Sequence, residues 1–89
     1  MANPTQYIFP VQTRHVEGEQ LVGVINGSNV SFQTASAFIP GKIAVYLNGL
    51  KQREGVGNDY TEISDTMIQM NNPPLPEDTV YADYLRRHN

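Results

Sequence analysis

The residue types that most often hold a metal or move a proton are sparse in this chain. It has two histidines, His15 and His88. Neither histidine belongs to a set of ligands spaced along one face of an element, as a zinc site requires. Glu17 and Glu19 follow His15 at two-residue steps on a polar segment, which is typical of a solvated stretch. The sequence therefore predicts no metal site.

Carboxylates are the next candidates, because two of them can share the acid and base roles of glycoside hydrolysis. Such a pair needs a cleft that raises the pKa of one member, and a chain of 89 residues offers little room for a cleft. Nearly all of the nine carboxylates flank predicted turns, where acidic side chains commonly bond to the local backbone; they are Glu17, Glu19, Glu54, Asp59, Glu62, Asp65, Glu77, Asp78 and Asp83.

Other catalytic patterns are also missing from the sequence. There is no nucleophile elbow and no set of Ser, His and Asp in a plausible context. The run Gly55-Val56-Gly57 is not followed by a predicted helix, as a phosphate-binding loop would be. We therefore predict that the protein is not an enzyme and uses no cofactor.

Tyrosines are frequent for so short a chain, with five present. Tyr46 and Tyr81 alternate with apolar neighbours, so both are expected to point away from the apolar face of their strands. An exposed pair of tyrosines indicates either a protein interface or a platform for a sugar ring. The alternative is that both belong to the core on a second face of the sheet.

Three parts of the chain are candidates for contact with a partner protein. The first is an apolar cluster near the N-terminus, the second is a polar strand with two exposed cations, and the third is a basic segment near the C-terminus that could pair with an acidic patch. The candidate contact residues are Tyr7, Ile8, Phe9, Lys51, Arg53, Arg86 and Arg87.

Composition narrows the class of protein that could carry these contacts. The length fits one domain, and the absence of Cys rules out disulfides and thiolate metal sites. The net charge of −3 argues against nucleic acid, which requires a concentrated basic face. No apolar run reaches the roughly 20 residues of a membrane-spanning helix. The first residues do not resemble a signal peptide, so we expect synthesis in the cytoplasm.

The elements that must position these residues are predicted to be β-strands. Apolar and polar residues alternate along short runs separated by turn signals about every 8–12 residues, as in a sandwich or a small barrel. The strongest hairpin signal is Asn48-Gly49, which suits a type I′ turn. We predict an all-β protein, a small antiparallel sandwich or barrel of about seven strands, with strands at 21–25, 30–34, 42–47, 50–54, 60–63, 66–70 and 78–86 and a turn at 39–41.

The first part of the chain is predicted to be organised differently from the rest. Residues 1–19 are expected to form an extended arm, because Pro4 and Pro10 exclude a helix there, and residues 20–89 are expected to form the β-domain. Two interpretations of the arm remain open. It could dock on a neighbouring subunit, or it could form an edge strand of the domain's own sheet.

Several motifs together resemble a β-rich module of structural proteins of tailed phages. The motifs are the turn Asn26-Gly27-Ser28-Asn29 with Phe32, the hairpin Val45-Tyr46-Leu47-Asn48-Gly49, the loop that ends in Asp59-Tyr60-Thr61, and a proline-rich loop followed by Asp83-Tyr84. The resemblance covers about residues 20 to 84. The chain departs from it in the longer loop at 55–59, in Met70 where Phe is common, and in Pro76-Glu77. These departures concern turn shape and packing rather than the fold.

The resemblance implies a structural component of a tailed-phage virion. The expected partners are other virion proteins, in the capsid or in the neck, tail or baseplate, and a homo-oligomer or symmetric array is expected. The family supplies no catalytic residue that can be carried over to this chain. An alternative function is a carbohydrate-binding module for glycans on the host surface.

Overall fold

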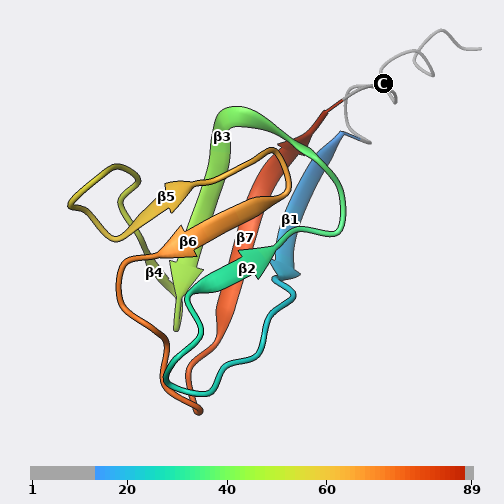
Figure 1. The fold of residues 1–89 in the computed structure, drawn as a ribbon. Helices are drawn as coiled ribbons and strands as arrows, with labels where there is room; N and C mark the ends of the chain where they lie inside the picture. The colour runs from blue at the N-terminus through green and yellow to red at the C-terminus, as the bar shows by residue number, and fades with distance from the viewer. Residues whose placement is uncertain (1–13, 88–89) are drawn as a thin grey trace, which may run out of the picture.

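The computed structural model describes residues 14–87, which form seven strands and no helix. The strands make two antiparallel sheets, ordered β1-β7-β3-β4 and β2-β6-β5, and the smaller sheet lies in front of the larger one in Figure 1. The prediction of a small all-β fold with about seven strands is confirmed. The strands are β1 (His15–Gln20), β2 (Ser31–Gln33), β3 (Phe38–Leu47), β4 (Leu50–Lys51), β5 (Tyr60–Glu62), β6 (Met67–Met70) and β7 (Val80–Arg86).

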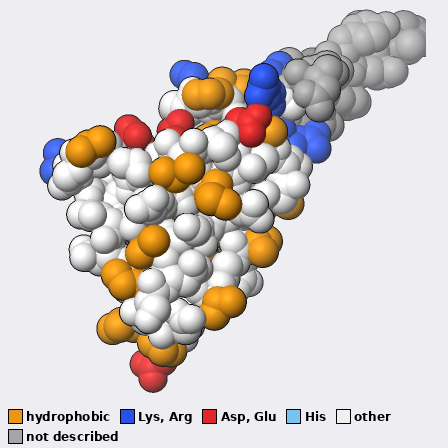
Figure 2. All heavy atoms as spheres, viewed as in Figure 1, with side chains coloured by type: hydrophobic (Ala, Val, Ile, Leu, Met, Phe, Trp, Pro, Cys, Tyr) orange, Lys and Arg blue, Asp and Glu red, His pale blue; other side chains and the backbone are white. Residues whose placement is uncertain are grey.

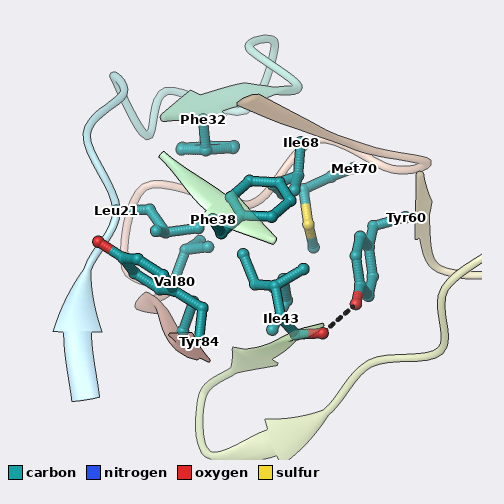
Figure 3. Packing of buried hydrophobic residues seen from close by; sticks show 11 residues of the cluster. Leu21, Phe32, Phe38, Ile43, Tyr60, Ile68, Met70, Val80 and Tyr84 are labelled. Carbon is teal, nitrogen blue, oxygen red and sulfur yellow. Dashed lines mark hydrogen bonds between the residues drawn. The ribbon is translucent and has the colours of Figure 1, made fainter. Parts of the chain in front are cut away.

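The core lies between the two sheets and follows the two-residue period of the strands. On β7, Val80, Ala82 and Tyr84 are buried whereas Tyr81 and Asp83 point outward, as the sequence predicts. Figure 3 shows the packing of the cluster, including Tyr60 of the smaller sheet, whose hydroxyl donates a hydrogen bond of 3.1 Å to the carbonyl of Ile43 in the larger one. The buried apolar residues are Leu21, Phe32, Phe38, Ile43, Val45, Tyr60, Ile68, Met70, Val80, Ala82 and Tyr84.

The two sheets are joined along both of their sides. On one side the amide of Leu21 donates to the carbonyl of Val80 in the larger sheet, and the next residue, Val22, pairs with Gln33 in the smaller sheet. On the other side Glu54, just beyond β4, pairs with Tyr60 of β5. The fold is therefore a sandwich whose sheets are linked by single bridges, which gives it part of the closure of a barrel.

The segment predicted as a strand at 21–25 is a loop that contains only the bridge at Val22. Leu21 is buried and Ile25 packs against the core whereas Val22 and Val24 are largely exposed, so the side chains alternate as in a strand although regular pairing is absent. The reason lies at Gly23, where an added Cβ would lie 2.5 Å from a ring carbon of Phe32. The buried Phe32 ring packs against the bare backbone of Gly23, and this close approach replaces regular strand pairing.

The turn predicted at residues 39–41 lies inside strand β3. The register of β3 against β7 shifts between Phe38 and Ile43, so this stretch is a β-bulge rather than the end of a strand. Gly41 adopts a positive φ of 80°, and its amide donates to the carboxylate of Glu62 at 3.0 Å. The bulge is therefore anchored to the other sheet, a long-range contact that local turn signals do not reveal.

The described part of the predicted arm, which extends to residue 19, forms a strand rather than a free extension. Strand β1 pairs with β7, with His15 opposite Leu85 and Gln20 opposite Tyr81. Residues 1–13, which carry the apolar cluster Tyr7, Ile8 and Phe9, lie outside the described residues. The edge-strand interpretation therefore applies to the part of the arm that begins at His15.

The predicted type I′ hairpin between β3 and β4 is present. Both turn residues have positive φ, 52° at Asn48 and 84° at Gly49. The Asn48 side chain also holds the proline-rich loop, donating to the carboxylate of Asp78 at 2.8 Å and accepting from the amide of Thr79 at 2.9 Å. One residue thus shapes the hairpin and fixes the connection between β6 and β7.

Candidate interaction surface

The exposed edge of β2 is closed by the chain that precedes it. The side-chain amide of Asn29 donates to the carbonyl of Ser31 at 2.9 Å, and its oxygen accepts from the Ser31 amide at 3.2 Å. Gln33 exchanges two backbone hydrogen bonds of 2.8 Å with Val22. Since unpaired edge groups are what recruit an added strand, the paired groups of Ser31 and Gln33 are not open to a partner strand.

The edge of β1 is irregular in a way that also discourages strand addition. Its register against β7 shifts between Val16 and Glu19. Within this bulge Gly18 adopts a positive φ of 67°, and its amide donates to the carboxylate of Asp83 at 2.7 Å. Bulges of this kind twist an edge away from flat pairing. These two edges are therefore poor sites for an added strand, and the faces of the sheets are better candidates for partner binding.

The outer face of the smaller sheet carries no charged side chain along β2 and β6. The two segments that build it, residues 21–41 and 66–76, contain no Asp, Glu, Lys or Arg. Figure 2 views this side of the molecule, and charged side chains appear around the upper margin and at the lower tip rather than across the middle. We call this surface the uncharged face and define it by Val22, Val24, Ser31, Gln33, Met67 and Gln69.

Register places these side chains next to one another. Gln33 pairs with Val22 on one side and with Met67 on the other, so the three form a row across the face. Ser31 pairs with Gln69 in the next outward row. A shallow depression lies beside these rows and is lined by Val22, Gly23, Val24, Asn26, Asn29, Ser31, Gln33 and Met67. We call it the valine depression.

The valine depression combines accessible apolar side chains with uncharged polar ones. The exposed fractions of Val22 and Val24 are 61% and 64%, and Met67 is half-buried. Single exposed apolar residues are common on protein surfaces, but here they share one hollow that has no charge around it. Interfaces are likewise poor in charged residues at their centre and enriched in Met.

The loop beside the depression is held in one conformation by its own side chains. The Asn26 side-chain oxygen accepts from the amides of Ser28 and Asn29, both at 2.9 Å. The side-chain amide of Asn29 donates to the carbonyl of Val24 at 3.0 Å, and the backbone amide of Gly27 donates to the carbonyl of Pro74 in the loop between β6 and β7. Because the loop is already ordered, binding there costs little further conformational entropy.

The opposite face, on the larger sheet, carries the predicted tyrosine pair. Tyr46 and Tyr81 are direct partners in the register of β3 and β7. Gln20 pairs with Tyr81 and Lys51 pairs with Tyr46, so the four residues make one row across the sheet. Tyr81 is 36% exposed and Tyr46 is half-buried. The expectation that both point away from the core is confirmed.

The structure separates the predicted cationic contacts into two groups. Lys51 and Arg53 are both exposed and line one depression beside β4 and β5. Arg87 forms an ion pair with Asp65. Arg86 is half-buried and pairs in register with Phe38 at the start of β3, whereas Lys51 pairs with Tyr46 near its end. The two groups therefore lie toward opposite ends of β3.

The groups with shifted pKa values belong to the core and the loops rather than to the uncharged face. Burial raises the pKa of Tyr60 to about 12, with a smaller effect from the neighbouring Glu62. Burial and then the hydrogen bond to Glu19 raise the pKa of Tyr84. Hydrogen bonds from the Asn48 side chain and the Leu75 amide lower the pKa of Asp78. Each shift has a local cause in the fold, either burial or a hydrogen bond.

Within residues 14–87, no group of three or more His, Asp or Glu side chains is arranged to hold a metal ion. In the same residues, no helix is long and apolar enough to cross a membrane.

Comparison with known proteins identified no relative. No protein-family model matches the chain, and no match was found among curated proteins or among solved structures. The exposure of Val22, Val24 and Met67 was not predicted from the sequence. The signal that could have found them is the complete lack of charge over 21–41 and 66–76, which include both strands of the uncharged face.

Proposed function

We propose that this protein is a non-enzymatic structural component of a tailed-phage virion that binds other virion proteins. The observation that carries the protein-binding part is the uncharged face, whose rigid rim and exposed valines suit contact with another protein. The virion part rests on the sequence resemblance, which includes Phe32 and the Asn48-Gly49 hairpin. Candidate positions are the capsid surface, the neck, the tail and the baseplate.

Size gives a physical reason for such a role. A domain of 89 residues without disulfides has a modest core and gains stability when partner subunits cover more of its surface. A symmetric particle repeats the same contact many times, so a small interface per copy is sufficient. We expect the partners to be capsid or tail subunits, with copies of this chain forming a homo-oligomer or symmetric array.

The test is light scattering of the purified protein with two kinds of particle. Saturable binding to capsid shells that lack this protein, at a fixed ratio to the capsid subunit, would support a decoration role. Binding to tail assemblies alone would support a tail or baseplate role. Binding to neither kind of particle would overturn the proposal.

A second function is favoured by the tyrosine pair on the opposite face. Tyr46 lies directly across from Tyr81, and two neighbouring rings with a flanking amide from Gln20 could stack against a sugar. This carbohydrate-binding function predicts glycan affinity for the isolated chain. Tyr81→Ala should abolish that affinity and Met67→Ala should not, because Met67 lies on the other sheet. Affinity that survives Tyr81→Ala would contradict it.

A further inference from the structure

We propose that the valine depression of one copy receives the apolar segment Tyr7-Ile8-Phe9 of a second copy. This inference deepens the proposed function and rests on it, because it names the segment and the surface through which copies assemble. It also connects two parts of the chain, the apolar cluster before β1 and the valine depression after it.

The two surfaces match in chemical character. Residues 1–13 contain no Asp, Glu, Lys or Arg, and they include Tyr7, Ile8, Phe9 and Val11. The depression is equally free of charge and is lined by Val22, Val24 and Met67, with Asn and Gln side chains around them. A charged segment would lose hydration in this hollow without gaining a partner, whereas an uncharged apolar segment loses little. Of the stretches without charge, only residues 1–13 lie outside the described fold.

Chain geometry favours a second copy over the same copy. The amide of Arg86 donates to the carbonyl of Arg14, and the amide of Leu21 donates to Val80, so six residues of β7 separate Arg14 from Leu21. Six residues of strand span about 20 Å, and the depression begins beyond Leu21. Phe9 precedes Arg14 by five residues, so it extends at most about 18 Å from Arg14. In the same copy, the Cα of Phe9 would stop short of Leu21 even with the segment fully extended back along β1, so a second copy reaches the depression with less stretching of the chain.

The depression suits an extended segment better than a helix or an added strand. Pro4 and Pro10 disfavour a helix through the segment, and Pro10 lacks the amide that a regular ladder would use. The backbone groups of Ser31 and Gln33 beside the hollow are already paired. Binding is therefore expected to depend on side-chain contact, with Ile8 and Phe9 against Val22, Val24 and Met67.

Cysteine cross-linking tests the contact directly, because the protein has no cysteine of its own. Full-length Phe9→Cys is mixed under mild oxidation with full-length Val24→Cys, and separately with Tyr81→Cys as a control on the opposite sheet. We expect a mixed disulfide dimer with Val24→Cys that forms at least about tenfold faster than the dimer with Tyr81→Cys. Equal rates would overturn the proposal. So would a monomeric disulfide within a Phe9→Cys/Val24→Cys double variant, which would place the segment in its own copy.

Sedimentation of the full chain tests the energetic importance of the contact. Met67→Lys buries an unpaired charge in the proposed contact and should weaken self-association at least about tenfold, which corresponds to a cost of about 1.4 kcal/mol. Tyr81→Lys, which adds the same charge to the other sheet, should leave self-association unchanged. Equal effects of the two variants would overturn the proposal, as would a wild-type chain that stays monomeric at millimolar concentration.

The outcomes separate this inference from the proposed function. Cross-linking at Val24 without binding to shells or tails would leave the contact between copies standing and remove the virion role. Binding to shells or tails without preferential cross-linking would support the virion role and overturn the contact between copies.

Discussion

The hydroxyl of Tyr84 donates a hydrogen bond of 2.5 Å to the carboxylate of Glu19, across the pairing of β7 and β1. The other carboxylate oxygen of Glu19 accepts from the amide of Ala35 at 2.7 Å, and the Ser36 amide donates to the Tyr84 hydroxyl at 3.3 Å. These bonds tie β1 and β7 to the loop that joins the two sheets. They explain why the chain from His15 onward belongs to the domain.

Tyr84→Phe removes this bond while keeping the buried ring. A hydrogen bond to a carboxylate typically contributes about 1.5–3 kcal/mol, so we expect a loss of about 1.5 kcal/mol in the free energy of unfolding. In a Glu19→Ala background, where the acceptor is gone, the same change should cost much less, and denaturant titration of the four proteins measures this coupling. Tyr81→Phe is the control and should cost under about 0.5 kcal/mol. Additive effects would show that the two side chains do not act together.

Alkaline stability should depend on Tyr60. Its pKa is raised to about 12, so between its ordinary value of 10.0 and 12 the unfolded chain loses the proton before the folded chain does. The stabilisation is thus complete below pH 10 and declines as the pH rises toward 12. Tyr60→Phe should be less stable than wild type at pH 8, because the bond to Ile43 is lost, but should lose less stability between pH 10 and pH 12. If wild type and Tyr60→Phe lost equal stability between pH 10 and pH 12, Tyr60 would not be the cause of the alkaline decline.

Acid stability should depend on the link between Asn48 and Asp78. The pKa of Asp78 is lowered in the folded state, so this group stabilises the fold above its unfolded pKa of about 4, and the effect is lost as the pH falls through the folded value. Asn48→Gly keeps a residue that accepts positive φ and removes the side-chain bond. It should lower the melting temperature at pH 7, and the difference from wild type should shrink at pH 2. A difference that is the same at both pH values would show that Asp78 is not involved.

Close packing at Gly23 should make this position intolerant of any side chain. An added Cβ would lie 2.5 Å from a ring carbon of Phe32 and 2.8 Å from the carbonyl oxygen of Ser31. We expect Gly23→Ala to cost about 1–3 kcal/mol in the free energy of unfolding, as overpacking does. Val24→Ala, one residue away at an exposed position, should cost under about 0.5 kcal/mol. Gly23→Ala at wild-type stability would show that the loop can move away from Phe32.

The elements that could be predicted from the sequence are those defined by local rules. Asn48-Gly49 requires only that two adjacent residues accept positive φ, and the burial of Tyr84 follows from alternation along one strand. The elements that were missed depend on distant contacts. The bulge at Gly41 is fixed by Glu62, and the loop at Gly23 by Phe32. No local pattern records which distant side chain approaches a glycine.

The candidate surface could be predicted only in part from the sequence, for a related reason. Lys51 and Arg53 are exposed as predicted, because cations two residues apart share one face of a polar strand and that face stays in water. Val22 and Val24 have the composition of a buried strand, so their exposure could not be read from their type. Only the register of Val22 with Gln33 places them on the outer face.

The final prediction concerns residues 1–12, which precede every element of the described fold. Strand β1 begins at His15 and is held by β7, so deleting these residues leaves every strand of residues 14–87 in place and should change the free energy of unfolding by less than about 1 kcal/mol. The deletion also removes Tyr7, Ile8 and Phe9, so we expect the shortened protein to fold but to lose incorporation into the particle, as measured by its stoichiometry in purified virions. Normal incorporation would exclude a role of the segment in assembly. Unfolding would instead show that the segment completes the domain's own sheet.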